Sequence, residues 1–106
     1  MIVENGLGAH DVIADDGQVH DPYRISCLKE HIDALKEAVK DGVDVIGCMP
    51  WTAIDLVALS TGTIAKRYGF IYVDMQDDGS GSLKRIPKDS CTWYKNVIAS
   101  NGDTNI

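Results

Sequence analysis

The chain has 106 residues, 44% hydrophobic and 25% charged, which is the composition of one ordinary folded domain and not of a disordered tail or a fibre. A formal net charge of −6 argues against nucleic-acid binding, because contact with a phosphate backbone needs clustered Lys and Arg. Three widely spaced cysteines exclude a disulfide framework and a Cys-x-x-Cys metal site. No apolar run approaches the roughly 18 residues of a membrane span, so we expect no membrane partner and a cytoplasmic protein.

The chain opens with the pattern of a strand and a loop. Residues 1–4 are typical of the end of a buried strand, and Asn5-Gly6 is typical of a turn, since both residue types tolerate positive φ. Glu4 is therefore expected at the carboxyl end of this strand. A long loop is predicted over residues 7–20, with at most one turn of helix.

A helix and a second strand follow. Asp21 supplies an N-cap, Pro22 the first helical position and Gly42 the end of the helix. The β-branched run 43–48 predicts a strand buried on both faces, and a strand–helix–strand unit of this kind has parallel strands and a right-handed crossover. The buried face of the helix is expected to hold Ile25, Leu28, Ile32, Leu35 and Val39.

The second half predicts a hairpin and a final helix. Residues 70–74 and 83–86 flank an Asp-Asp-Gly-Ser-Gly turn, and Pro87 is expected to stop the second strand. Asp89 or Ser90 then begins a helix that runs through Ser100, and the last four residues should fray. Its predicted buried face holds Cys91, Tyr94, Val97 and Ile98.

Two residues at the predicted strand ends have alternative interpretations. Glu4 stands where β/α barrels place catalytic groups, but a surface carboxylate at a turn is the commoner case. Trp51, directly after Pro50, is either a platform on which a sugar stacks or a packed aromatic residue.

The loop before the hairpin carries groups that suit an anion. Ser60 offers a hydroxyl, Lys66 a cation and Tyr68 a phenol, while Gly62 allows the loop to curl. Together these groups can bind a phosphate or a sulfate. The alternative is a flexible loop in which Lys66 and Arg67 are solvated.

No metal or cofactor is expected. The segment from Asp74 partly imitates a calcium-binding loop, but Arg85 stands where the bidentate Glu is required. The three histidines lie on different predicted elements, where ordinary helix or loop positions are commoner than metal ligands.

Five motifs stand out along the chain. The first is Val3-Glu4-Asn5-Gly6, and the others are Asp21-Pro22-Tyr23-Arg24-Ile25, Trp51-x3-Asp55, Lys66-Arg67-Tyr68-Gly69-Phe70-Ile71-Tyr72-Val73-Asp74 and Trp93-Tyr94-Lys95. In order and spacing they resemble glycoside hydrolase family 1, whose T/V-E-N-G motif the first one matches, and most closely its bacterial 6-phospho-β-glucosidases.

The resemblance implies an α/β fold that is the C-terminal portion of a (β/α)8 TIM barrel. Residues 1–106 would form one partial domain with about the last two β/α units plus a β-hairpin. In the intact enzyme Glu4 would be the nucleophile of a retaining glycosidase and Trp51 the platform beneath the glycone. The acid/base Glu would lie upstream, so the chain alone is expected to be inactive.

The resemblance also implies a phosphorylated β-glucoside as substrate. Family members that act on plain glucosides carry a Glu seven residues beyond this Trp, where the chain has Ala58. Ser60, Lys66 and Tyr68 match the positions by which the phospho-specific branch holds the 6-phosphate. At the position after Ala58, non-phosphorylated and phospho-galactoside members have a Trp and phospho-glucosidases commonly a small residue. Leu59 therefore argues against the Trp type but leaves 6-phospho-β-galactosidase specificity open.

Two further expectations concern the chain by itself. Val3, Val45 and Ile46 should remain partly uncovered beside unpaired sheet edges, which favours self-association. The competing hypothesis for function is a non-catalytic module, in which the same loop binds a phosphate or a partner and nothing is cleaved.

Overall fold

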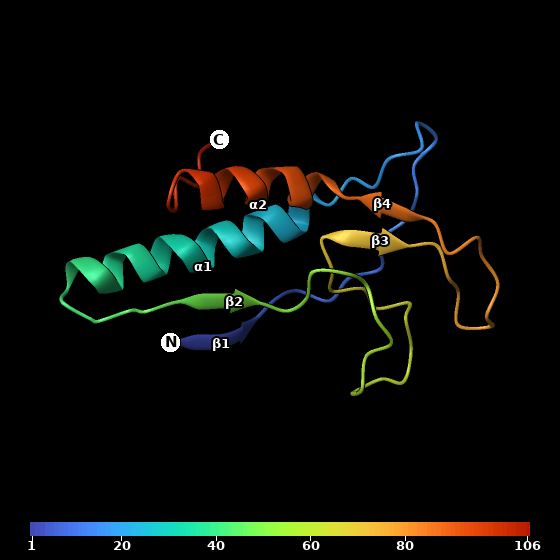
Figure 1. Ribbon diagram of the computed structural model, residues 1–106, viewed down its shortest axis with the longest axis horizontal. Helices are drawn as coiled ribbons and strands as arrows, with labels where there is room; N and C mark the ends of the chain where they lie inside the picture. The colour runs from blue at the N-terminus through green and yellow to red at the C-terminus, as the bar shows by residue number, and fades with distance from the viewer.

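The computed structural model describes residues 1–106 as two helices and two small sheets in a flat body of 49 × 30 × 18 Å (Figure 1). The radius of gyration is 14.9 Å, whereas a compact domain of this length has about 13 Å. Only 19 of the 106 residues are buried. The apolar core is therefore small for the length of the chain, and other interactions must hold the loops in place.

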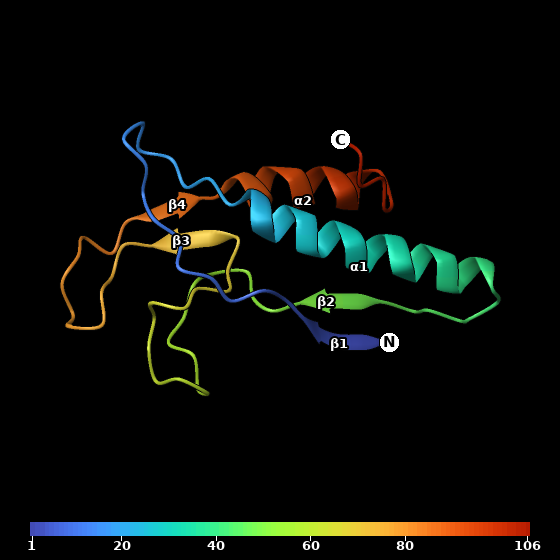
Figure 2. The ribbon, with the colours of Figure 1, turned by 180° about the vertical axis from the view of Figure 1, so that it is seen from behind.

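A parallel pair of strands forms one edge of the molecule. β1 (Ile2–Asn5) pairs with β2 (Cys48–Pro50) and is linked to it through α1 (Pro22–Lys40), which confirms the predicted parallel unit. Both strands point toward the end of the molecule that carries the loops, as opposite views show (Figures 1 and 2). The predicted bounds 43–48 are wrong for β2, because residues before 47 extend past the start of β1 and have no strand to pair with.

β1 is largely exposed and β2 is only half-buried, so the prediction of buried strands is wrong for this chain. Val3 is 72% exposed and Ile46 75%, because no second layer covers them. The expectation that barrel-facing apolar side chains remain uncovered is confirmed at these two positions.

The two helices lie side by side, and both begin near the middle of the molecule, next to the hairpin and the loops (Figures 1 and 2). α2 (Asp89–Ala99) has nearly the predicted bounds, but Val39 of α1 and Ile98 of α2 are exposed, because neither meets a packed neighbour. Neither helix is both long and apolar enough to cross a membrane. The larger apolar cluster between the helices and the hairpin consists of Leu28, Phe70, Trp93 and Val97.

The predicted hairpin is confirmed. β3 (Ile71–Val73) pairs antiparallel with β4 (Arg85–Pro87), and Tyr72 and Ile86 pack with Val19 in a second small apolar cluster. β4 ends at Pro87, as predicted, although Pro87 still pairs with Ile71 as the last residue of the strand, which an edge strand tolerates because the missing N–H is not needed for pairing.

Asp21 joins the beginnings of the two helices. It occupies the N-cap position of α1, as predicted, but its side chain makes no cap bond there. It accepts hydrogen bonds from the Ser90 backbone N (2.9 Å) and Ser90 Oγ (2.5 Å) in the first turn of α2. Asp21 thus caps the other helix, since Lys88 at the N-cap of α2 makes no side-chain cap bond.

The last residues do not fray as predicted. Thr104 is buried, its carbonyl accepts a hydrogen bond from Trp93 Nε1 (3.3 Å), and its hydroxyl donates to Asp33 Oδ1 (2.7 Å) on α1. The tail therefore ties α1 to α2.

A buried ionic network lies where the loops meet the helices. Lys88 Nζ donates to Asp11 Oδ2 (2.6 Å) and Asp55 Oδ1 (2.8 Å), and Lys88 and both carboxylates are fully enclosed. Arg67 bonds the second oxygen of Asp55 (3.1 Å), and Arg24 bonds Asp11 (3.0 Å). One ammonium group therefore connects the loop after β1 to the loop after β2.

Asp21 completes this network through Arg24 (2.5 Å), so that three cations balance three carboxylates. Burial by itself raises the pKa of Asp11, but hydrogen bonds from Lys88, Tyr23 and Arg24 outweigh it, and the net pKa lies below the usual value. Burial likewise raises the pKa of Tyr23, whose hydroxyl donates to Asp11. The Asp11 carboxylate is thus held in its charged form.

Removing Lys88 should destabilise the fold strongly. Lys88→Met leaves Asp11 and Asp55 buried with fewer partners, and breaking a buried pair in this way costs about 3 to 5 kcal/mol. Urea denaturation should show this loss in the free energy of unfolding. The control Lys40→Met breaks an exposed pair with Glu37 and should cost less than about 1 kcal/mol. Equal losses in the two variants would contradict the structural role of Lys88.

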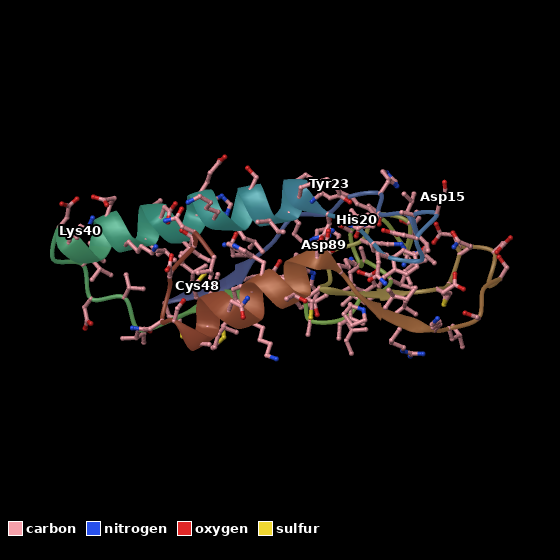
Figure 3. All side chains as sticks on the ribbon, turned by 90° about the horizontal axis from the view of Figure 1, so that it is seen from above. Asp15, His20, Tyr23, Lys40, Cys48 and Asp89 are labelled. Carbon is pink, nitrogen blue, oxygen red and sulfur yellow. The ribbon has the colours of Figure 1, made fainter.

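His20 makes a second, exposed link between the loop and α2, close to Asp89 (Figure 3). Its Nδ1 lies 2.7 Å from Asp89 and its Nε2 2.8 Å from Asp16. These hydrogen bonds, that of Asp89 first, raise the pKa of His20 from 6.5 to about 8. Since the folded pKa is the higher one, protonated His20 stabilises the fold fully below pH 6.5, and this stabilisation disappears as the pH rises through about 8.

The variant His20→Gln should therefore lower the thermal midpoint most at pH 6 and least at pH 9. Melting curves of both proteins across this range measure the difference. A difference that stays constant with pH would show that the charge of His20 does not contribute.

Candidate active site

A cavity of about 490 Å³ opens at the carboxyl ends of β1 and β2. It brings together four of the five predicted site residues, Glu4, Trp51, Ser60 and Tyr68. Lys66 does not line it. The remaining lining residues are Leu56, Val57, Ala58 and Leu59.

Glu4 lies near the end of β1 with its side chain exposed to this cavity. The turn after it is tight, since a Cβ on Gly6 would collide with the carbonyl oxygen of Trp51. Only glycine permits this approach, which brings the end of β1 against the end of β2. The sequence interpretation of Glu4 as a strand-end carboxylate is confirmed as to position.

Trp51 follows β2 directly. Its backbone N donates to the Asn5 carbonyl (2.7 Å), and its side chain remains 40% exposed on the cavity wall. The ring is therefore partly open, as a stacking surface requires, and is not a fully packed core aromatic residue.

Ser60 lies in a turn at the outer side of the cavity. The turn is closed by hydrogen bonds from Gly62 N to the Ala58 carbonyl (2.7 Å) and from Ala58 N to the Thr63 carbonyl (2.9 Å). Gly62 has φ = 69°, as its predicted role in curling the loop requires. Ala58 is buried, whereas Leu59 is fully exposed beside it.

Lys66 and Tyr68 lie on the same side of their segment, with Lys66 Nζ 5.9 Å from the centre of the Tyr68 ring. Tyr68 reaches the cavity and Lys66 stands exposed next to it. The alternative of a solvated Lys66-Arg67 pair is wrong for Arg67, which is only 2% exposed.

Glu4 is the only carboxylate on the cavity wall. A shallower hollow on the other side of Glu4 is lined by Ile2, Asn5, His31 and Ala34, and adds no second acid. Asp55 lies four residues after Trp51 in the sequence, but its carboxylate is enclosed in the ionic network with Arg67 and Lys88 and does not line the cavity.

Comparison with known proteins identifies the family. Residues 1–103 match glycosyl hydrolase family 1, and the chain belongs to this family. It is similar to the family 1 β-glucosidase of Thermotoga maritima, with a TM-score of 0.85 and 39% identity over 96% of this chain. The chain spans 22% of that structure, and thus forms the predicted C-terminal part of a (β/α)8 barrel.

The chain is also similar in sequence to curated members of the family. The chain is 60% identical to the aryl-phospho-β-D-glucosidase BglA of Bacillus subtilis and 55% identical to the 6-phospho-β-glucosidase AscB of Escherichia coli. Each match covers 97% of this chain and 22% of the relative. The chain thus spans less than a quarter of the length of these relatives.

Sequence reasoning missed the residues that hold the site in place. Arg24, Arg67 and Asp55 were noted as parts of motifs, but their burial was not foreseen, and Asp11 and Lys88 were not singled out at all. One available signal was the alternation of side chains along an extended backbone. If Lys66 and Tyr68 share one side of the chain, Arg67 between them must point to the other side.

Proposed function

We propose that this chain supplies the nucleophile and the phosphate subsite of a retaining glycosidase that hydrolyses 6-phospho-β-glucosides. Glu4 attacks the anomeric carbon and forms a glycosyl-enzyme, and a second carboxyl group about 5 to 5.5 Å away acts first as acid and then as base. That second group is not on this chain's cavity wall. Hydrolysis therefore needs a carboxyl group from elsewhere in the barrel.

The observation that carries this proposal is the shared cavity of Glu4, Trp51, Ser60 and Tyr68. A carboxylate, a partly open indole face, a hydroxyl and a phenol around one cavity suit a sugar that is attacked at C1 and held at C6. The names of the most similar curated relatives support the same substrate class.

The wall at Ala58 supports a phosphorylated substrate. Where this residue is a carboxylate, it repels a phosphate and occupies its space, whereas Ala58 does neither. Lys66, exposed beside Tyr68, supplies the cation that a phosphate dianion requires.

Glu4→Gln should abolish turnover in a complete barrel. We suggest replacing the matching segment of B. subtilis BglA with residues 1–106, which are 60% identical to it. On an aryl 6-phospho-β-glucoside, loss of the nucleophile should lower kcat by at least about 10³-fold. The control Glu37→Gln, on the exposed face of α1, should keep full activity. Activity retained by Glu4→Gln would remove Glu4 from the mechanism.

Lys66→Ala in the same chimera should discriminate between substrates. A charge-assisted hydrogen bond to phosphate contributes about 1.5 to 3 kcal/mol, so kcat/KM for the 6-phospho-substrate should fall about tenfold to over a hundredfold. The unphosphorylated aryl glucoside should be little affected, and Lys84→Ala in the exposed hairpin loop serves as the control. Equal losses on both substrates would make Lys66 a structural residue.

The 106-residue chain by itself should be inactive and should self-associate. It has one carboxylate on the cavity wall, and the exposed β1 and β2 offer unpaired edges to a second copy. Light scattering at several concentrations should show species larger than 11.5 kDa, and an aryl 6-phospho-β-glucoside should not be cleaved. A monomer at all concentrations contradicts the assembly, and turnover that depends on Glu4 contradicts the inactivity.

A further inference from the structure

The side chain of Arg67 is held from several directions. Its guanidinium group donates to Asp55 Oδ2 (3.1 Å) and to the carbonyls of Val73 (2.7 Å) and Met75 (2.8 Å). It also lies 3.9 Å from the centre of the Tyr72 ring, within the range of a cation–π contact. With these bonds made in a buried site, Arg67 cannot turn without losing several of them at once.

The backbone of Arg67 is held as firmly as its side chain. Its N donates to the Ala9 carbonyl (2.7 Å), and Ala9 N donates back to the Arg67 carbonyl (2.9 Å) in an antiparallel bridge. Arg24 Nη2 donates to the same carbonyl (2.9 Å). Ala9 lies five residues beyond Glu4, so this bridge connects the nucleophile segment directly to the segment of Lys66 and Tyr68.

Arg67 forms an isolated bridge with Ala9 and turns its side chain inward, whereas the side chains of its neighbours Lys66 and Tyr68 both lie against Gly8. The exposures agree, because Arg67 is buried while Lys66 is exposed and Tyr68 is half-buried. Arg67 thereby determines the direction of both neighbours without touching the cavity itself.

Gly8 forms the surface on which these two side chains rest. A Cβ at this position would lie 2.5 Å from Tyr68 Cζ and 2.8 Å from Lys66 Cε. Both distances are shorter than carbon atoms can approach, and the Tyr68 ring is rigid. Any side chain larger than hydrogen must therefore displace the phenol, the ammonium group or both.

We propose that Gly8 and Arg67 are positioning residues that set the distance between the nucleophile Glu4 and the 6-phosphate subsite. Gly8 and the Ala9–Arg67 bridge join the two segments at a single register, so the Lys66 and Tyr68 side chains keep one position relative to Glu4, as a hexoside attacked at C1 and held by a phosphate on C6 requires. This inference rests on the proposed function, since it assigns a cause to the placement of Lys66 and Tyr68 that the function requires.

The test is Gly8→Ala in the BglA chimera, compared with Gly47→Ala, whose Cβ would meet only ordinary contacts with Met1. Gly8→Ala should raise KM for an aryl 6-phospho-β-glucoside by about tenfold or more and weaken inhibition by inorganic phosphate equally, since small misplacements at a site have large effects. Its kcat/KM for the unphosphorylated glucoside and the values for Gly47→Ala should stay within about twofold of the parent, the usual scatter of neutral surface changes.

A double-mutant comparison separates positioning from general damage. In a Lys66→Ala, Tyr68→Ala background, Gly8→Ala should add no further rise in KM, because the side-chain atoms that its Cβ would displace are already absent. If Gly8→Ala folds poorly, Arg67→Lys serves as a second variant, since it keeps the charge but loses several of the guanidinium N–H donors. It should raise KM for the phosphorylated substrate without changing kcat/KM for the unphosphorylated one. An equal loss on both substrates, or additive effects in the double-mutant comparison, would overturn the proposal.

The proposed function can fail separately. If Lys66→Ala affects both substrates equally, the phosphate subsite itself is wrong. If Lys66→Ala affects only the phosphorylated substrate but Gly8→Ala changes neither, the positioning role of Gly8 is wrong.

Discussion

The double ion pair of Lys88 with Asp11 and Asp55 is the interaction on which the rest of the structure depends. Asp11 belongs to the loop after β1, Asp55 to the loop after β2, and Lys88 to the junction of β4 with α2. A chain with so few buried apolar residues cannot place three such segments by hydrophobic packing alone. Each loop must run so that its carboxylate reaches the Lys88 ammonium group, and this fixes the directions of both loops. The shape of the cavity between the loops depends on these directions.

This arrangement favours a unique geometry over a large stability. Burying six charged groups carries a desolvation penalty that can exceed the energy of their mutual attraction. A buried network is therefore weak support for high stability. It is, however, directional, because guanidinium and carboxylate groups accept few alternative partners. Being enclosed, the network is also little screened by salt, unlike the exposed pair of Lys40 with Glu37. The half of the site present in this chain is therefore pre-arranged by the chain itself.

Sequence patterns predicted the features that neighbouring residues determine. The helix after Pro22, the turn of the hairpin and the strand-end position of Glu4 all follow from local spacing and turn chemistry. Interactions with distant residues were missed or wrong, such as the inward Arg67 and the ordered Thr104, because nothing nearby in the sequence identifies their partners. For the candidate site, side-chain chemistry indicated Ser60, Lys66 and Tyr68 as anion-binding groups, and the resemblance supplied their match to a 6-phosphate. The crowding above Gly8 depends on a segment nearly sixty residues away and leaves no local signal.

The cap that Asp21 provides for α2 has a consequence for how the chain reaches its fold. Residue 21 emerges during synthesis 69 positions ahead of Ser90, a delay of roughly 3 to 14 seconds at common translation rates. Through that interval the Asp21 carboxylate lacks Ser90 and the Arg24 guanidinium lacks the Arg67 carbonyl, although Arg24 can already pair with Asp11 and Asp21. α2, in turn, starts with amides that the side chain of its own N-cap residue does not satisfy. The start of α2 is therefore completed by a residue of the first helix, and this junction can form only after both helices have been synthesised.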